Sequence, residues 1–140
     1  MIDTSLLLLL LAIIIIGVFV FVAIWFTGRH THQFDKEDYQ TDFIAIENQL
    51  IKEQPLTFNA TVIEADKLLD KALMELGIPG KTMGERLKRS GTKFSELNSV
   101  WYAHKLRNQI AHERGFQVEF TQARHALATY KQALKDLGAI

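Results

Sequence analysis

The stretch TVIEADKLLDKALMELG, residues 61–77, decides the fold class expected for this chain. Apolar side chains recur in it every three or four positions, which places them on one face of an α-helix. Gly77 and Pro79 supply the stop, and the start is expected between Thr57 and Thr61. The stretch therefore predicts an amphipathic helix, with one apolar face made of Val62, Ala65, Leu69, Leu73 and Leu76.

Helical spacing continues on both sides of this stretch. It predicts helices over about 39–52, 94–113 and 121–137, and the capping-box pattern TMGE, residues 82–85, predicts a short helix as far as about Arg89. We therefore expect residues 39–140 to form an all-α, antiparallel helical bundle with four principal helices and a short one. Because a bundle this small buries a limited core, a homodimer is also expected.

The chain begins with a long apolar run, from Leu6 to Phe26, that contains no charged side chain. At about 1.5 Å per residue the run spans about 30 Å, the thickness of the hydrocarbon core of a bilayer. A cleaved signal peptide is the alternative, but it would need a basic start, a shorter apolar core and a small-x-small cleavage site. We therefore expect residues 1–28 to be a single transmembrane anchor, followed by a juxtamembrane linker over residues 29–38.

Residues at the end of the apolar run suit a membrane boundary. Trp25 and Phe26 belong at the headgroup layer, and Arg29 and Lys36 follow the run, whereas no Lys or Arg precedes it. We therefore expect a single-pass protein of the cell membrane with its soluble domain in the cytoplasm. The apolar run has no ionisable residue, which excludes a transporter with an ion or solute pathway.

Charge is distributed unevenly along the chain, although the formal net charge is zero. Residues 35–78 hold ten acidic and four basic side chains, a balance of −6, whereas residues 81–114 hold eight basic and three acidic ones, a balance of +5. The basic part is either a solvated helix surface or a face that attracts phosphate. The absence of cysteine excludes disulfide and thiolate chemistry, and no carboxylate cluster demands a metal, so we expect no cofactor.

The basic part contains KLRNQIAHER, residues 105–114. On a helical wheel, His104, Arg107, Asn108 and His112 continue the face that is apolar in the preceding turns, within a stripe about 140° wide. Arginine offers a fixed fork of donors to phosphate oxygens, histidine transfers protons near neutral pH, and asparagine orients either one. The set suits attack on a phosphodiester without a metal, although His104 is equally read as a packing or hydrogen-bonding residue.

The segment RNQIAH, residues 107–112, resembles the signature of the HEPN superfamily, in which four to six residues separate an arginine from a histidine. The segments ADKLLD (65–70), GERL (84–87) and AHKLRN (103–108) are similar to small membrane-anchored HEPN-like proteins of bacteria. The resemblance covers about residues 39–138. It implies a metal-independent endoribonuclease of toxin or defence type, with the site at a dimer cleft, where the ribose 2′-hydroxyl attacks the adjacent phosphate. A cognate antitoxin or another protein partner would accompany such a domain.

Applied to this chain, the resemblance implies that Arg107 binds the scissile phosphate and that His112 acts as general acid or base. Asn108 would be the polar residue that tunes the other two. On a straight helix the side chains of Arg107 and His112 diverge by about 140°, so convergence needs the reach of arginine, a distorted helix end or the partner protomer. Toxin-type members are usually soluble, whereas this chain is anchored. RNA would be guided by His104 and by the basic residues Lys81, Arg86, Lys88, Arg89 and Lys105.

Some HEPN-like domains are helical modules without enzymatic activity. In such a domain, Arg107 and His112 would hold a dimer or a protein partner together and no reaction would occur. The sequence therefore leaves two functions open: a membrane-anchored ribonuclease, or a membrane-tethered interaction and dimerisation module.

Overall fold

The computed structural model describes residues 3–27 and 34–140. The chain divides into two compact units, Met1–Gln33 and Phe34–Ile140. The described residues form six α-helices and two short 3₁₀ helices, and they contain no β-strand. The predicted all-α class is confirmed.

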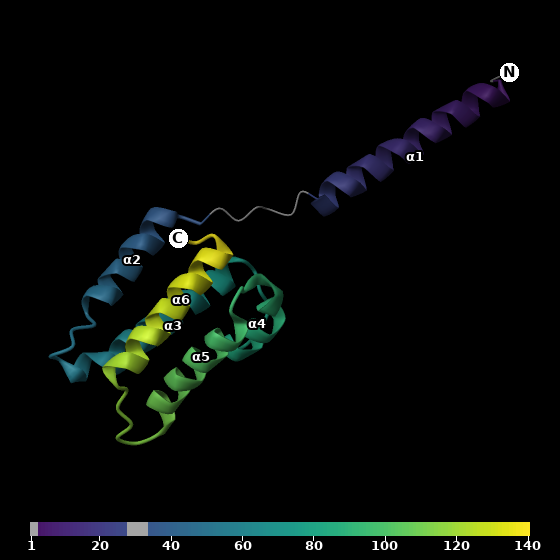
Figure 1. Cartoon of the computed structure of the whole chain (residues 1–140). Helices are drawn as coiled ribbons and strands as arrows, with labels where there is room; N and C mark the ends of the chain where they lie inside the picture. Colours follow the sequence, from purple (N-terminus) through teal and green to yellow (C-terminus); the bar gives the residue numbers. More distant parts are fainter. Residues whose placement is uncertain (1–2, 28–33) are drawn as a thin grey trace. The chain divides into compact units, whose positions relative to one another are not determined.

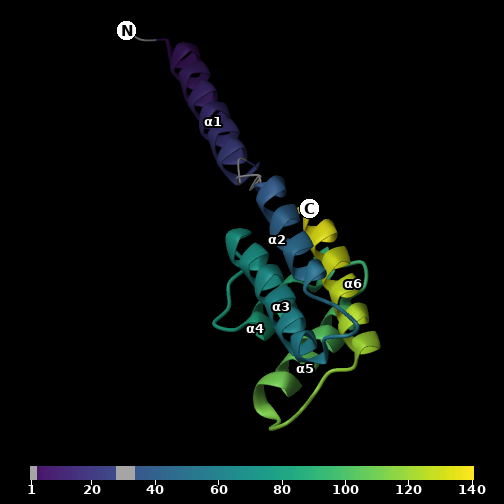
Figure 2. The ribbon, with the colours of Figure 1, turned by 90° about the vertical axis from the view of Figure 1, so that its left-hand side faces the viewer.

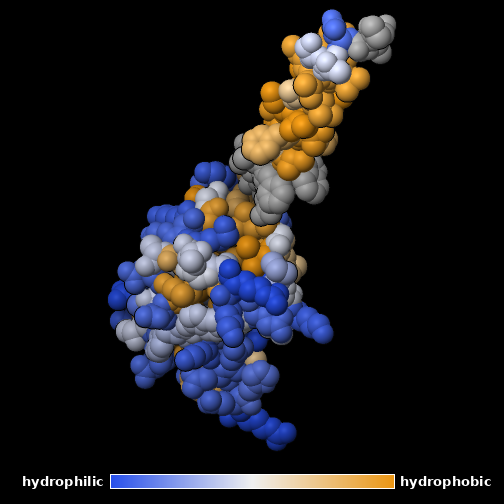
Figure 3. Space-filling view, turned by 90° about the vertical axis from the view of Figure 1, so that its right-hand side faces the viewer, coloured by the Kyte–Doolittle hydropathy of each residue, from blue (hydrophilic) through white to orange (hydrophobic). Residues whose placement is uncertain are grey.

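The described part of the first unit contains one helix, α1 (Thr4–Thr27). Its segment Thr4–Ile24 has a mean hydropathy of 3.5 and is long and apolar enough to cross a membrane, and each of its side chains is exposed. Figure 3 shows the apolar surface along this helix. The side chains of Trp25, Phe26 and Arg29, which we expected at the membrane boundary, lie outside the described residues, as do residues 29–33 of the expected linker.

The second unit holds the remaining helices. Its four long helices, α2, α3, α5 and α6, alternate in direction along the chain, so that α3 and α6 run the same way (Figures 1 and 2). Helix α3 packs against α2, α4, α5 and α6, and α6 also packs against α5. The stretch that decides the fold class therefore lies in the middle of the unit, with Val62, Ala65, Leu69 and Leu73 fully buried. The helices are α2 (Lys36–Asn48), α3 (Phe58–Glu75), α4 (Met83–Ser90), α5 (Leu97–His112) and α6 (Phe120–Leu137), with 3₁₀ helices η1 (Pro55–Thr57) and η2 (Gly91–Lys93).

Helix α2 begins three residues before the predicted position. The carboxylate of Asp35 accepts a hydrogen bond from the backbone N–H of Asp38 at 3.2 Å, which caps the first turn. Phe34 is buried and packs edge-on against Tyr39, with ring centroids 5.3 Å apart. Residues 34–38, which we expected in the linker, therefore belong to the second unit.

Two other helix starts depend on polar side chains. The Thr82 hydroxyl accepts from the N–H of Glu85, as the capping-box pattern predicts, but the Glu85 carboxylate accepts from the N–H of Lys81 instead of that of Thr82. Helix α5 begins at Leu97 and not at Phe94, because Phe94 is extended (φ −102°, ψ 131°) and Ser95 binds the α6 residue Asp136 through its N–H and its hydroxyl, both at 2.8 Å.

Candidate functional site

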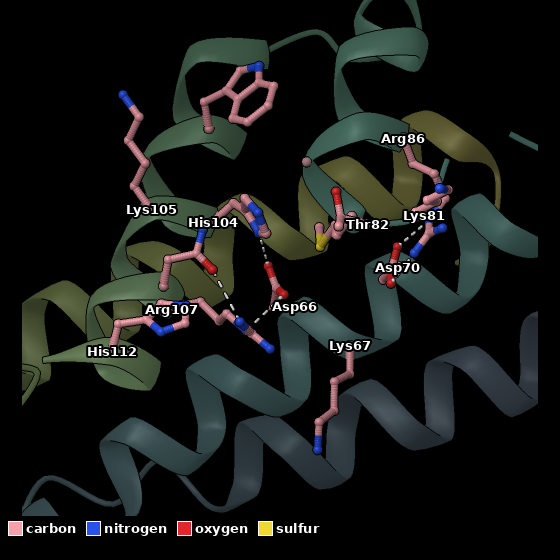
Figure 4. Close-up of a pocket in the computed structure, with 14 residues that line it drawn as sticks. Asp66, Lys67, Asp70, Lys81, Thr82, Arg86, His104, Lys105, Arg107 and His112 are labelled. Atoms are coloured by element: carbon pink, nitrogen blue, oxygen red, sulfur yellow. Dashed lines mark hydrogen bonds and ion pairs between the residues drawn. The ribbon is translucent and has the colours of Figure 1, made fainter. Parts of the chain in front are cut away.

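Helices α3, α4 and α5 line a pocket of about 760 Å³, shown in Figure 4. Helix α3 contributes two carboxylates to it, α4 contributes Arg86, and α5 contributes Arg107 and the two histidines. Five basic and two acidic side chains line it, together with two histidines and one tryptophan. The charged set is Asp66, Lys67, Asp70, Lys81, Arg86, Lys105 and Arg107, and the rings are Trp101, His104 and His112.

Asp66 is the buried centre of this site. It lies on α3 within the apolar face, and 3% of it is exposed. Its Oδ1 atom accepts hydrogen bonds from Tyr130 Oη at 2.9 Å and from His104 Nδ1 at 2.8 Å. Its Oδ2 atom lies 3.4 Å from Arg107 Nε. One carboxylate therefore ties α3 to α5 and α6, and two hydrogen bonds and the charge of Arg107 compensate its burial.

Tyr130 keeps its proton in this arrangement. Burial raises the pKa of its hydroxyl well above the ordinary value, and the negative charge of Asp66 and the hydrogen bond to it act in the same direction. The hydroxyl is thus a permanent donor to Asp66 and takes no part in proton transfer near neutral pH.

Arg107 is held from two sides. Its Nε atom is buried and lies near Asp66, without the geometry of a hydrogen bond, while Nη1 donates to Asn108 Oδ1 at 3.1 Å. The other terminal nitrogen, Nη2, makes no hydrogen bond within the part of the chain that the structure describes. The guanidinium is therefore oriented by Asp66 and Asn108 and retains free donors for an anion.

His112 is the last residue of α5 and is exposed at the edge of the pocket. Arg107, Asn108 and His112, the three residues with predicted catalytic roles, thus line one pocket of a single chain. The Arg107 side chain extends toward α3 (Figure 4). The reach of arginine therefore makes up part of the divergence expected between positions 107 and 112 on the helix. His104 and Lys105, with predicted roles in RNA binding, line the same pocket.

The other basic residues predicted to guide RNA lie in different surroundings. Arg86 is buried and forms a two-point ion pair with Asp70, in which Nε and Nη2 each lie 2.7 Å from a carboxylate oxygen, and Nη1 donates to the carbonyl of Gly80. The hydrogen bond to Asp70 raises the pKa of Arg86, which secures its charge. Lys88 and Arg89 are exposed on α4 and do not line the pocket, and Arg89 donates to the carbonyl of Pro79 at 2.6 Å.

The charges that remain after pairing favour an anionic ligand. Asp70 is neutralised by Arg86, Asp66 faces Arg107, and Lys67 forms an exposed ion pair with Glu64 at 2.9 Å. The ammonium groups of the pocket residues Lys81 and Lys105 have no carboxylate partner among the residues described by the structure. The same residues contain no group of His, Cys, Asp and Glu side chains able to hold a metal ion. The pocket therefore suits phosphate oxygens better than a cation.

Sequence reasoning gave no role to Asp66, Asp70 and Tyr130. Asp66 left a signal, because it falls between Val62 and Leu69 at helical spacing and so is a carboxylate inside an apolar face. The partners of that carboxylate come from α5 and α6, far away in the sequence, and no local pattern identifies them.

Comparison with protein-family models, with curated proteins and with solved structures gives no match for this chain.

Proposed function

We propose that residues 34–140 form a HEPN-like domain that cleaves RNA without a metal, with its active site in the pocket between α3, α4 and α5. The observation that supports this proposal is Arg107, whose guanidinium is oriented by Asp66 and Asn108 while Nη2 stays available. A fixed guanidinium with free donors, in a pocket that also holds unpaired lysines, matches a phosphodiester. His112 supplies an exposed imidazole at the edge of the same pocket.

In this proposal, Arg107 binds the non-bridging oxygens of the scissile phosphate and stabilises the charge that grows on them. The ribose 2′-oxygen attacks the phosphorus, and the bond from phosphorus to the 5′-oxygen breaks. A base removes the proton of the 2′-hydroxyl and an acid protonates the 5′-oxygen, and His112 performs one of these transfers. The products are a 2′,3′-cyclic phosphate and a 5′-hydroxyl.

The proposal includes the anchor and the dimer. Helix α1 would hold the domain at the membrane with the domain in the cytoplasm, so that the RNA it meets is membrane-associated or diffuses to that surface. A second copy would face the end of α5 and add its own Arg107 and His112 to the cleft.

The full chain, reconstituted in lipid nanodiscs, tests the proposal on a mixed RNA pool in the presence of EDTA. We expect cleavage that leaves 2′,3′-cyclic phosphates, and a loss of about 100-fold or more in Arg107→Ala and in His112→Ala. Arg124→Ala and His125→Ala are matched controls, because both residues are exposed on α6 and do not line the pocket. If the parent leaves the pool intact, or if both site variants cut at the parental rate, the nuclease assignment fails.

One observation favours the second function, a membrane-tethered interaction module. Beside the first pocket, α5 borders a groove of about 490 Å³, and 48% of Tyr102 is exposed there. The groove shares Lys105, Asn108 and His112 with the first pocket and is otherwise lined by Tyr102, Leu106, Gln109 and Glu113. An exposed aromatic ring beside a groove is typical of a protein interface. If this function holds, Tyr102→Ala weakens self-association or capture of a partner, measured by sedimentation of the detergent-solubilised chain, and no variant affects RNA.

A further inference from the structure

His104 has the surroundings of a general base. Its Nδ1 atom lies 2.8 Å from Asp66 Oδ1, the oxygen that also accepts from Tyr130. Since the carboxylate is an acceptor, the imidazole places its proton on Nδ1, and the lone pair of the neutral ring is then on Nε2. A carboxylate that orients an imidazole in this way also stabilises the positive charge that the ring gains when it takes a second proton.

The Nε2 edge of His104 faces the pocket. This atom makes no hydrogen bond to a residue that the structure describes, and a Cβ atom placed on Gly84 would lie 3.7 Å from it. The ring of Trp101 packs edge-on against the imidazole, with centroids 6.1 Å apart. One tenth of the His104 side chain is exposed. The imidazole is therefore held by the core on one edge and is open on the other, next to a residue without a side chain.

Building on the ribonuclease function proposed above, we propose that His104, oriented by Asp66, is the general base of the reaction and that His112 is the acid. His104 Nε2 takes the proton of the 2′-hydroxyl as the bond from the 2′-oxygen to phosphorus forms. His112 gives its proton to the 5′-oxygen as the bond from phosphorus to that oxygen breaks. Both imidazoles recover their starting protonation by exchange with water.

The order of these residues along α5 supports the division of roles. His104 and His112 are eight positions apart, about 12 Å along the helix axis and about 80° around it, and along the axis Arg107 lies between them. A phosphate bound to Arg107 would therefore have one imidazole on each side of it along the axis of α5. The two rings also differ in setting, since His104 is fixed by a buried carboxylate whereas His112 is exposed at the helix end.

The test is single-turnover RNA cleavage by the full chain in nanodiscs. We expect His104→Ala to lower the rate about 100-fold or more, with RNA affinity retained, and His125→Ala to leave it unchanged. Imidazole and its substituted analogues, added to His104→Ala, should restore part of the rate. Because a base in the rate-limiting step follows Brønsted behaviour, the restored rate should change with the pKa of the analogue, which a purely structural filler would not produce.

Gly84→Ala provides a test that leaves His104 and its hydrogen bond to Asp66 in place. The new methyl group makes ordinary contact with Nε2 and lies in a helix, where alanine is favoured over glycine, so the fold is retained. We expect several-fold slower cleavage with an unchanged unfolding midpoint or a higher one. This variant decides the matter if His104→Ala does not fold.

The outcomes separate the two proposals. If the parent cuts RNA and folded His104→Ala cuts within about threefold of it, the role of His104 is wrong and the nuclease assignment stands. The role is equally wrong if no analogue restores the rate, or if the rescued rate is independent of analogue pKa, while Gly84→Ala cuts like the parent. If the parent does not cut RNA, both proposals fail together.

Discussion

Replacing Asp66 by alanine should be among the most destabilising changes in the second unit. The hydroxyl of Tyr130, which is fully buried, would lose its acceptor, at a cost of about 1–3 kcal/mol. The lost bond to His104 adds about 1 kcal/mol, and the loss at Arg107 is smaller because 30% of that side chain is exposed and water solvates it. Removing a desolvated carboxylate offsets part of this. We expect a net loss of about 3 kcal/mol, or about 12 °C in melting temperature.

Urea unfolding of the full chain in detergent, followed by the fluorescence of Trp101, measures this loss. The sequence holds two tryptophans, so a Trp25→Phe background leaves Trp101 as the reporter. Glu64→Ala is the matched control, since it removes a carboxylate of the same helix whose ion pair with Lys67 is exposed, and it should cost less than about 0.5 kcal/mol. A double-mutant cycle with Tyr130→Phe should give a coupling of about 1–2 kcal/mol.

Two results would refute the reasoning. One is an Asp66→Ala protein that unfolds within about 0.5 kcal/mol of the parent, the range of ordinary surface substitutions. The other is a cycle without coupling between Asp66 and Tyr130. Either would mean that the buried carboxylate does not join α3 to α5 and α6 in solution.

Three further predictions concern other polar contacts. Arg86→Lys should cost about 2 kcal/mol in urea unfolding, because an ammonium cannot make the two-point contact with Asp70; an unchanged midpoint would contradict this. Burial raises the pKa of Asp136, but the N–H and hydroxyl of Ser95 outweigh it and hold the pKa below the ordinary value. Asp136→Asn should therefore lower the free energy of unfolding by about 1 kcal/mol at pH 7. In unfolding across a pH series, the difference between parent and variant should shrink as the pH falls below about 3.9, the pKa of Asp136 in the unfolded chain, and should vanish below its lowered pKa in the folded chain. Asn59→Ala removes two hydrogen bonds to the segment before α6, and faster amide hydrogen exchange there, with a loss of about 2 kcal/mol, is expected.

Much of the fold was predictable because the apolar faces are nearly continuous. Helices α3 and α6 begin and end within about a residue of their predicted limits, since each has an amphipathic stripe and a glycine just beyond its end. The start of α5 was not predictable. Phe94 continues the apolar spacing, but Ser95 binds Asp136 across the bundle, and such a partner is invisible to a local pattern.

The residues of the candidate site on α5 were predictable from the sequence, but the contacts from other helices that hold them in place were not. Helical spacing alone placed His104, Arg107, Asn108 and His112 on one face, and in the structure all four line one pocket. Whether a basic residue is available for a ligand depends on tertiary pairing, as Arg86 illustrates through Asp70. For the same reason, the sequence did not reveal that Asp66 sets the orientation of both His104 and Arg107.

The position of Tyr130 bears on when a newly made chain acquires its site. Asp66 belongs to α3, but its hydroxyl partner, Tyr130, lies on α6, 64 residues later in the chain. Chains are synthesised from the N-terminus, so α1 and α3 leave the ribosome before α6. The hydrogen bonds of the carboxylate that orients His104 and Arg107 can therefore all form only after α6 has been made. Helix α1, which is long and apolar enough to cross a membrane, is thus made before all the contacts that orient His104 and Arg107 can form.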